Sequence, residues 1–102
     1  MSRKVPVTNP WDSIKGLVIQ LLAEATSLDA GKIQELVEIP PDPTLGDLAA
    51  TVAFQLAKQL RKNPSTIAAD IAIRMGERIK SEPVLHRVES KGPYVNVFLD
   101  RG

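Results

Sequence analysis

The sequence predicts a single α+β domain in which helices pack on one face of a small antiparallel sheet. Three segments between residues 10 and 80 carry apolar residues at helical spacing. Two strand-like segments joined by a Lys-Gly-Pro turn close the chain. Helices clustered beside consecutive antiparallel strands are typical of the α+β class. The length of 102 residues suits one domain, and the sheet face without helices is expected to meet solvent or a partner.

Composition narrows the possible functions. Apolar residues make up 43% of the chain, and thirteen basic residues against twelve acidic ones give a net charge of +1, so any contact with nucleic acid must come from a local patch. The lack of cysteine excludes disulfides and cysteine metal sites, and the single histidine, His86, is a poor metal site alone. The start has no secretory signal, and the most apolar run, residues 17–25, is too short to span a bilayer. We therefore expect a cytoplasmic protein without metal or membrane contact.

Residues 1–8 are predicted to be an N-terminal tail and residues 9–102 the domain. Asn9 and Pro10 form an N-cap followed by a first-turn proline, which predicts a helix over residues 10–27. Its apolar stripe is predicted to be Trp11, Ile14, Leu17, Val18, Leu21, Leu22 and Ala25. Alternating residues 33–39 then indicate a short strand ending at Pro40, although Leu36 faces the wrong way. The prolines that follow predict a loop.

Gly46 and Asp47 are expected to open a second helix, with Asp47 as its N-cap. The predicted core stripe is Leu48, Ala49, Val52, Ala53, Leu56, Ala57 and Leu60. Three basic residues at its C-terminal end, Lys58, Arg61 and Lys62, suit the negative end of the helix dipole.

Asn63 and Pro64 repeat the capping signal and predict a third helix that fades near Lys80. Its predicted core stripe is Ile67, Ala68, Ile71, Ala72, Met75 and Ile79. Asp70 and Arg74 are predicted to form an i, i+4 ion pair, and Gly76 suggests close packing. Residues 84–90 and 94–99 should then form an antiparallel hairpin.

The last strand divides its side chains between two faces. Val95, Val97 and Leu99 form an aliphatic set suited to the core. Tyr94 and Asn96 share the other face with Phe98. A ring can stack on a base and an amide can read a base edge, which indicates an RNA-contacting face. The alternative is that these are ordinary strand residues under a helix, with the amide satisfying nearby backbone.

Three motifs in order resemble the N-terminal additional domain of arginyl-tRNA synthetase. They are Gly46-Asp47 at a helix start with the following run 52–60, Asn63-Pro64-Ser65-Thr66-Ile67-Ala68, and Gly92-Pro93-Tyr94-Val95-Asn96-Val97-Phe98-Leu99. The resemblance covers residues 40–99 well, and the first helix by layout only. It implies an α+β domain that contacts the D-loop near the tRNA elbow. It also implies that Tyr94 and Asn96 touch an exposed base there, with Lys91 beside them.

The resemblance implies a parent enzyme that joins arginine to tRNA using ATP. This chain has no His-Ile-Gly-His-like or Lys-Met-Ser-Lys-like motif, so we expect no catalytic residue and no bound cofactor in it. It is then a part of the enzyme, acting beside the catalytic domain in cis, or a free-standing relative. We expect a monomer that binds arginine tRNA. The near-zero net charge keeps a second hypothesis open, a module that docks on the synthetase body or another protein.

Overall fold

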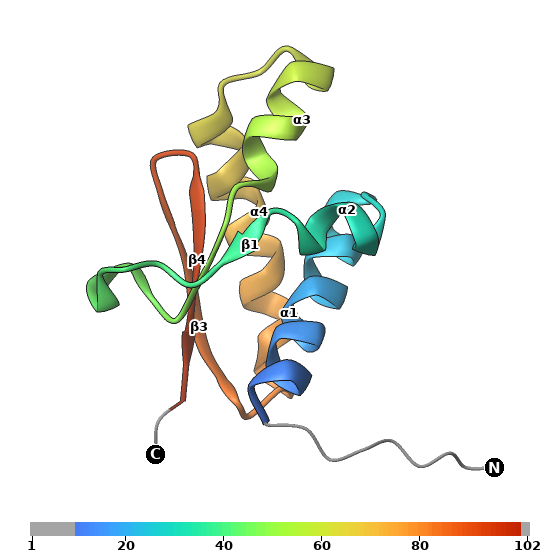
Figure 1. The fold of residues 1–102 in the computed structure, drawn as a ribbon. Helices are drawn as coiled ribbons and strands as arrows, with labels where there is room; N and C mark the ends of the chain where they lie inside the picture. The colour runs from blue at the N-terminus through green and yellow to red at the C-terminus, as the bar shows by residue number, and fades with distance from the viewer. Residues whose placement is uncertain (1–9, 101–102) are drawn as a thin grey trace, which may run out of the picture.

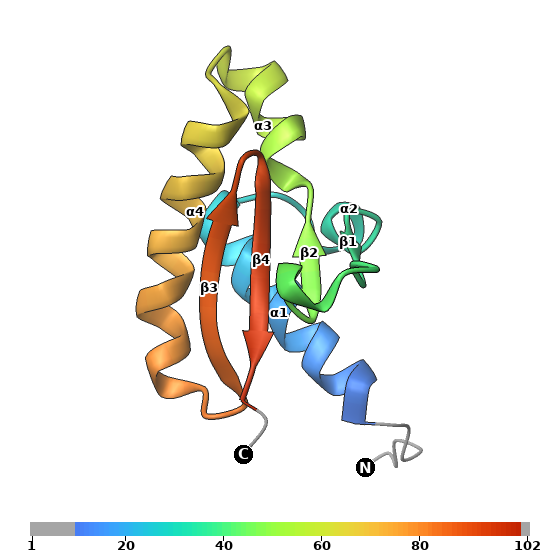
Figure 2. The ribbon, with the colours of Figure 1, turned by 90° about the vertical axis from the view of Figure 1, so that its left-hand side faces the viewer.

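The computed structural model describes residues 10–100, apart from the side chains of Pro10, Trp11 and Pro43. The predicted tail and the Asn9 cap lie outside these residues. The described part has two layers, with helices on one face of a sheet (Figures 1 and 2). This confirms the predicted α+β architecture.

The sheet has four antiparallel strands in the order β1-β2-β4-β3. The strands are β1 (Val37–Glu38), β2 (Leu48–Ala50), β3 (Leu85–Lys91) and β4 (Tyr94–Leu99). β3 and β4 form the predicted hairpin, in which Lys91 pairs with Tyr94. β4 is central, since Val97 pairs with Val88 on one side and Leu48 on the other. Its side chains therefore decide what both faces of the sheet present.

The helices are α1 (Pro10–Thr26), α2 (Ala30–Gln34), α3 (Val52–Leu60) and α4 (Pro64–Arg78), with short 3-10 turns η1 (Pro43–Leu45) and η2 (Ile79–Ser81). α4 begins as predicted, because the Asn63 side chain accepts a hydrogen bond of 2.8 Å from the Ser65 N–H. All six predicted core residues of this helix are buried. Val18, Leu21 and Leu22 of α1 are buried beside them.

The helix α2 includes Ile33 and Gln34, the first two residues of the strand predicted over residues 33–39. The Asp29 carboxylate accepts a 3.0 Å hydrogen bond from the Gly31 N–H and caps α2. Ile33 lies in this helix and is completely buried. A buried position needs an apolar residue in a helix as well as in a strand, so Ile33 also fitted the alternating pattern. Of the predicted strand over residues 33–39, only Val37 and Glu38 pair with a neighbouring strand. The local cap therefore prevailed over the alternation.

The prediction that Asp47 caps a helix was wrong. Leu48–Ala50 form β2, and α3 begins only at Val52. Asp47 instead accepts a 2.9 Å hydrogen bond from the Leu99 N–H, 52 residues away. The backbone of Leu48–Ala50 pairs with β4, so it is not available for the first turn of a helix. The residues predicted to be core are nevertheless mostly buried: Leu48, Ala49, Val52, Ala53 and Leu56 are buried and Ala57 packs against the core, whereas Leu60 is 52% exposed.

Asp47→Ala should lower the free energy of unfolding by about 1–3 kcal/mol, because the part-buried Leu99 N–H loses its acceptor. Chemical denaturation measures the change. Asp70→Ala is the matched control, because Asp70 pairs with Arg74 at 3.1 Å on an exposed helix surface. The control should lose only a few tenths of a kcal/mol. Equal losses in the two variants would show that the bond between Asp47 and β4 stabilises nothing.

Gly76 does not serve close packing. A Cβ built at this position meets no atom within 4 Å. Gly46 is the glycine that the packing requires: its φ is +98°, and an added Cβ would lie 2.8 Å from the Val97 carbonyl oxygen. The backbone of residue 46 therefore approaches β4 more closely than a side chain would allow.

Candidate nucleic-acid interface

The two faces of β4 differ as the alternation predicts. Val95 and Val97 are completely buried, and Leu99 packs partly against the core. Tyr94 on the other face is 41% exposed, whereas Asn96 is only 3% exposed. The helices lie behind the sheet, and the segment between β1 and β2 passes in front of it (Figure 2). Asn96 is thus buried, but the segment on its face of the sheet is a loop and not a helix.

A hollow of about 200 Å³ lies between this loop and the strands. It is lined by Glu38, Pro40, Pro41, Leu45, Ala49, Lys91, Tyr94 and Asn96. Pockets for drug-sized ligands begin at about 300 Å³, so this hollow suits one small ring system rather than a larger molecule. The three residues singled out from the sequence, Tyr94, Asn96 and Lys91, all line it.

Asn96 presents an unused amide to the hollow. Within residues 10–100 its side chain forms no hydrogen bond, and no polar atom of a buried side chain there is both enclosed and without a partner. The amide therefore still reaches solvent, which it meets in the hollow that Asn96 lines. An amide carries both a donor and an acceptor, so an occupant that displaces water from the hollow must offer hydrogen bonds or leave the amide unpaired at a cost in free energy. The hollow thus favours an occupant with hydrogen-bonding edges.

Tyr94 is held by an aromatic neighbour that the sequence did not reveal. Its ring lies edge-on to the ring of Phe54 in the first turn of α3, with centroids 6.0 Å apart and planes at 80°. Phe54 is itself 41% exposed. The apolar stripe of the predicted helix excluded Phe54 from the core, but the approach of a distant strand to it could not be read from spacing. The pair fixes one side of the Tyr94 ring.

Lys91 stands at the end of the hairpin, where the left-handed Gly92, with φ +57°, makes the turn. It pairs with Tyr94 across the two strands. Its side chain is exposed and has no ion pair within residues 10–100. A positive charge therefore lies beside the mouth of the hollow.

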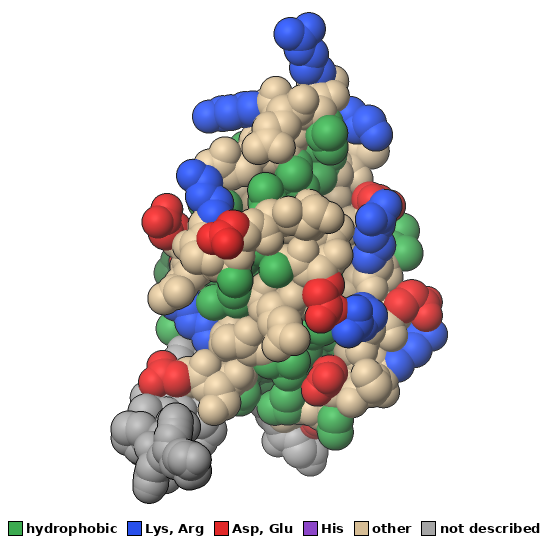
Figure 3. All heavy atoms as spheres, turned by 90° about the vertical axis from the view of Figure 1, so that its right-hand side faces the viewer, with side chains coloured by type: hydrophobic (Ala, Val, Ile, Leu, Met, Phe, Trp, Pro, Cys, Tyr) green, Lys and Arg blue, Asp and Glu red, His purple; other side chains and the backbone are tan. Residues whose placement is uncertain are grey.

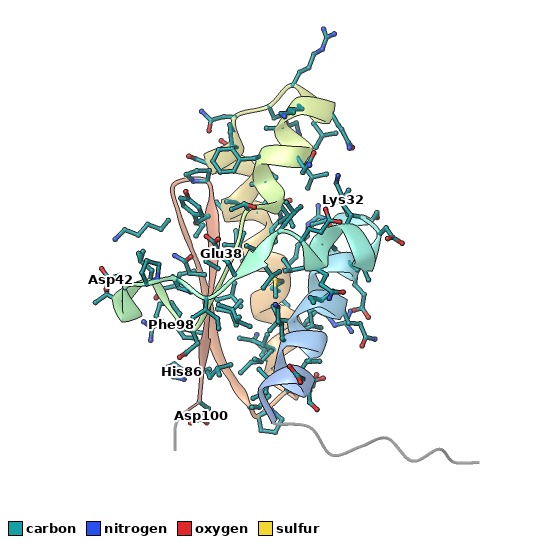
Figure 4. The ribbon with its side chains drawn as sticks, in the orientation of Figure 1. Lys32, Glu38, Asp42, His86, Phe98 and Asp100 are labelled. Carbon is teal, nitrogen blue, oxygen red and sulfur yellow. The ribbon has the colours of Figure 1, made fainter. Side chains whose placement is uncertain are left out.

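The loop that forms one wall is braced by a local turn. Asp42, labelled in Figure 4, accepts hydrogen bonds from the Thr44 N–H at 2.9 Å and the Thr44 hydroxyl at 2.8 Å. The hydrogen bond from the Thr44 N–H lowers the pKa of the Asp42 carboxyl the most, followed by that from the Thr44 hydroxyl. The positive charge of Lys91 lowers this pKa by a smaller amount. A lowered pKa means that the turn is stabilised at neutral pH and loses this contribution only as the pH falls into the strongly acidic range.

Phe98, the third residue of this face, is occupied differently. The Arg87 guanidinium lies 4.0 Å from the centre of its ring and also pairs with Glu89 at 2.6 Å. Phe98 therefore stacks against Arg87 of its own chain, and it is not among the residues that line the hollow. His86 is exposed nearby, and within the described residues no cluster of His, Cys, Asp or Glu could hold a metal ion.

Comparison with protein families matches residues 12–99 to the family described as arginyl tRNA synthetase N terminal domain. The chain belongs to this family. The arginine–tRNA ligase of Clostridium perfringens is 45% identical over 87 residues, which are 85% of this chain and 14% of that protein. The ligase of Streptococcus thermophilus is 50% identical over 74 residues (72% and 12%), and that of Methanobrevibacter smithii 48% over 64 residues (63% and 10%). The chain thus spans a small fraction of its relatives.

The match to the arginyl tRNA synthetase N terminal domain family includes every residue that lines the hollow. The hollow is therefore built from three separate segments of the family's domain: residues 38–49 of the loop and its flanking strands, and the two strands of the hairpin. No helix within the described residues is long and apolar enough to cross a bilayer.

Proposed function

We propose that this chain binds arginine tRNA and that the hollow takes an unstacked base of the D-loop, near the elbow. The observation that supports this most directly is the convergence of Tyr94, Lys91 and the unused Asn96 amide on one small hollow. The hollow lies in a domain of the arginyl tRNA synthetase N terminal domain family. Single-stranded loops are where proteins read RNA, through stacking and base-edge hydrogen bonds.

Each side chain has a distinct role in this proposal. The Tyr94 ring stacks on the base, and the contact with Phe54 keeps it in place. The Asn96 amide bonds the edge of the base from the floor of the hollow. Lys91 neutralises a neighbouring phosphate. Glu38 on the opposite wall adds a carboxylate that could accept from an exocyclic amino group.

The chain would contribute binding rather than chemistry. We propose that it acts in cis beside the catalytic domain of an arginine–tRNA ligase, which joins arginine to tRNA with ATP in the cytoplasm. The relatives are named arginine–tRNA ligases, and this chain covers 10–15% of their length. Binding to two surfaces of one tRNA raises the total affinity through effective concentration, so the chain alone should bind weakly.

A titration of fluorescent arginine tRNA against an unrelated tRNA tests the proposal. We expect weak binding that prefers arginine tRNA and falls with added salt, by a slope of about 0.7–0.9 for each phosphate neutralised. Replacing the D-loop nucleotides one at a time by abasic ones should weaken binding at one position. Equal affinity for every abasic form would contradict the placing of a D-loop base in the hollow.

The second candidate, a module that docks on another protein, has its support in the net charge of +1 and in exposed apolar side chains such as Ile73, which is 68% exposed. The same titration separates the two functions. A protein-docking module should bind neither tRNA, or bind both without dependence on salt.

A further inference from the structure

The corner where α3 ends and α4 begins carries a cluster of three basic side chains, Lys58, Arg61 and Lys62, here called the corner cations. All three are exposed, and none belongs to an ion pair within residues 10–100. The sequence from Leu48 to Ala69 contains no acidic residue. The next acid, Asp70, is already paired with Arg74. Figure 3 shows Lys and Arg side chains without Asp or Glu at this end of the molecule.

The dipole of α3 explains these residues only in part. A cation at a helix C-terminus has a modest stabilising effect that is confined to the last turn, and of the three only Lys58 lies in that turn of α3. Arg61 adopts the left-handed conformation, with φ 56° and ψ 43°, at the position that closes the helix. Glycine or asparagine is usual there, because other residues are strained. An arginine in this place is unfavourable for the fold itself, which points to a use for its charge.

The corner cations continue the surface that begins at the hollow. Phe54 touches Tyr94, and Lys58 follows Phe54 by four residues, so the two side chains share one face of α3. Arg61, seven residues after Phe54, lies about 10 Å from it along the helix axis. The order from the hollow is thus Tyr94, Phe54, Lys58 and Arg61: the turn of the hairpin lies beside the start of α3, and the end of α3 extends beyond it (Figures 1 and 2).

We propose that the corner cations bind the sugar-phosphate backbone of the same RNA whose base enters the hollow. This inference rests on the proposed function. Phosphate contacts carry no sequence information, so the corner would add affinity and set the direction of the strand while the hollow supplies selectivity. Lysine and arginine are the side chains that neutralise phosphates in such contacts. Because the net charge is only +1, RNA binding needs a local basic patch, and the three corner cations form one.

The test combines Lys58→Gln, Arg61→Gly and Lys62→Gln in one variant. The glycine relieves the left-handed strain, so this change should not weaken the fold at the helix end. We expect the slope of log affinity against log salt to fall in magnitude by about 2, with equal weakening for arginine tRNA and an unrelated tRNA. Circular dichroism and denaturation confirm the fold. A helix-dipole role alone would leave the salt slope unchanged.

The matched control combines Lys15→Gln, Lys32→Gln and Lys80→Gln, which removes the same charge from α1, α2 and η2. It should leave the slope nearly unchanged; Lys32 lies on the helical side, away from the hollow (Figure 4). A corner variant that behaves like this control would overturn the inference, while weakened binding by Tyr94→Ala would leave the proposed function standing. If the unaltered chain bound no tRNA at low salt, both proposals would fail.

Discussion

Val97→Asp should leave the domain largely unfolded at 25 °C. Val97 is completely buried in the central strand and pairs with Leu48 and Val88 on its two sides. The aspartate would place a carboxylate in an apolar core without a cation to pair with, at a cost of several kcal/mol. A domain of this size has about 5–15 kcal/mol of stability in total. Circular dichroism and denaturation with urea measure the loss.

Ile73→Asp is the matched control for this experiment. It makes the same change from a β-branched apolar residue to a carboxylate, but Ile73 is 68% exposed on α4. Surface substitutions of this kind usually change stability by about 0.5 kcal/mol or less. The control should therefore remain folded. A Val97→Asp protein as stable as the control would mean that β4 does not form the centre of the core.

The elements that the sequence predicts well are those whose signals are local. α4 has a cap residue, a first-turn proline and an apolar stripe on one side, and all three signals agree with the structure. The β3–β4 hairpin likewise depends on a turn and two neighbouring strands. β2 was not predicted, because Leu48–Ala50 become a strand only through pairing with Val95–Val97, almost fifty residues later. A glycine followed by an aspartate reads as a helix start until that partner is known.

The same division holds for the candidate site. Alternation along one strand was enough to group Tyr94 and Asn96, although it also grouped Phe98, which does not line the hollow, and the family resemblance added Lys91 from the turn before them. The opposite wall of the hollow could not be foreseen, because Pro40, Pro41 and Leu45 reach the sheet through a loop whose path follows the unpredicted β2. The depth of Asn96 follows from that wall. A strand pattern gives the face of a side chain but not what covers it.

Tyr94→Ala should weaken arginine tRNA binding about tenfold or more. Stacking on an aromatic ring is worth about 1–3 kcal/mol per base, and about 1.4 kcal/mol is a factor of ten. Tyr94→Phe is the matched control, since it keeps the ring and its contact with Phe54. It should retain most of the affinity. Fluorescence titration gives the affinities, and denaturation of each variant shows whether the fold has changed.

Asn96→Ala extends this prediction from affinity to selectivity. Asn96 is 3% exposed as a residue, and its amide has no hydrogen-bond partner within residues 10–100, so removing the amide should cost the fold little and affect mainly the base in the hollow. We expect the preference for the native D-loop base to shrink, whereas Tyr94→Ala weakens all bases alike, because an amide discriminates between base edges and a ring does not. Unchanged tRNA affinity in both folded variants would show that RNA binds elsewhere. Unfolding of both variants would show instead that Tyr94 and Asn96 serve the core, as the ordinary interpretation of this strand face holds.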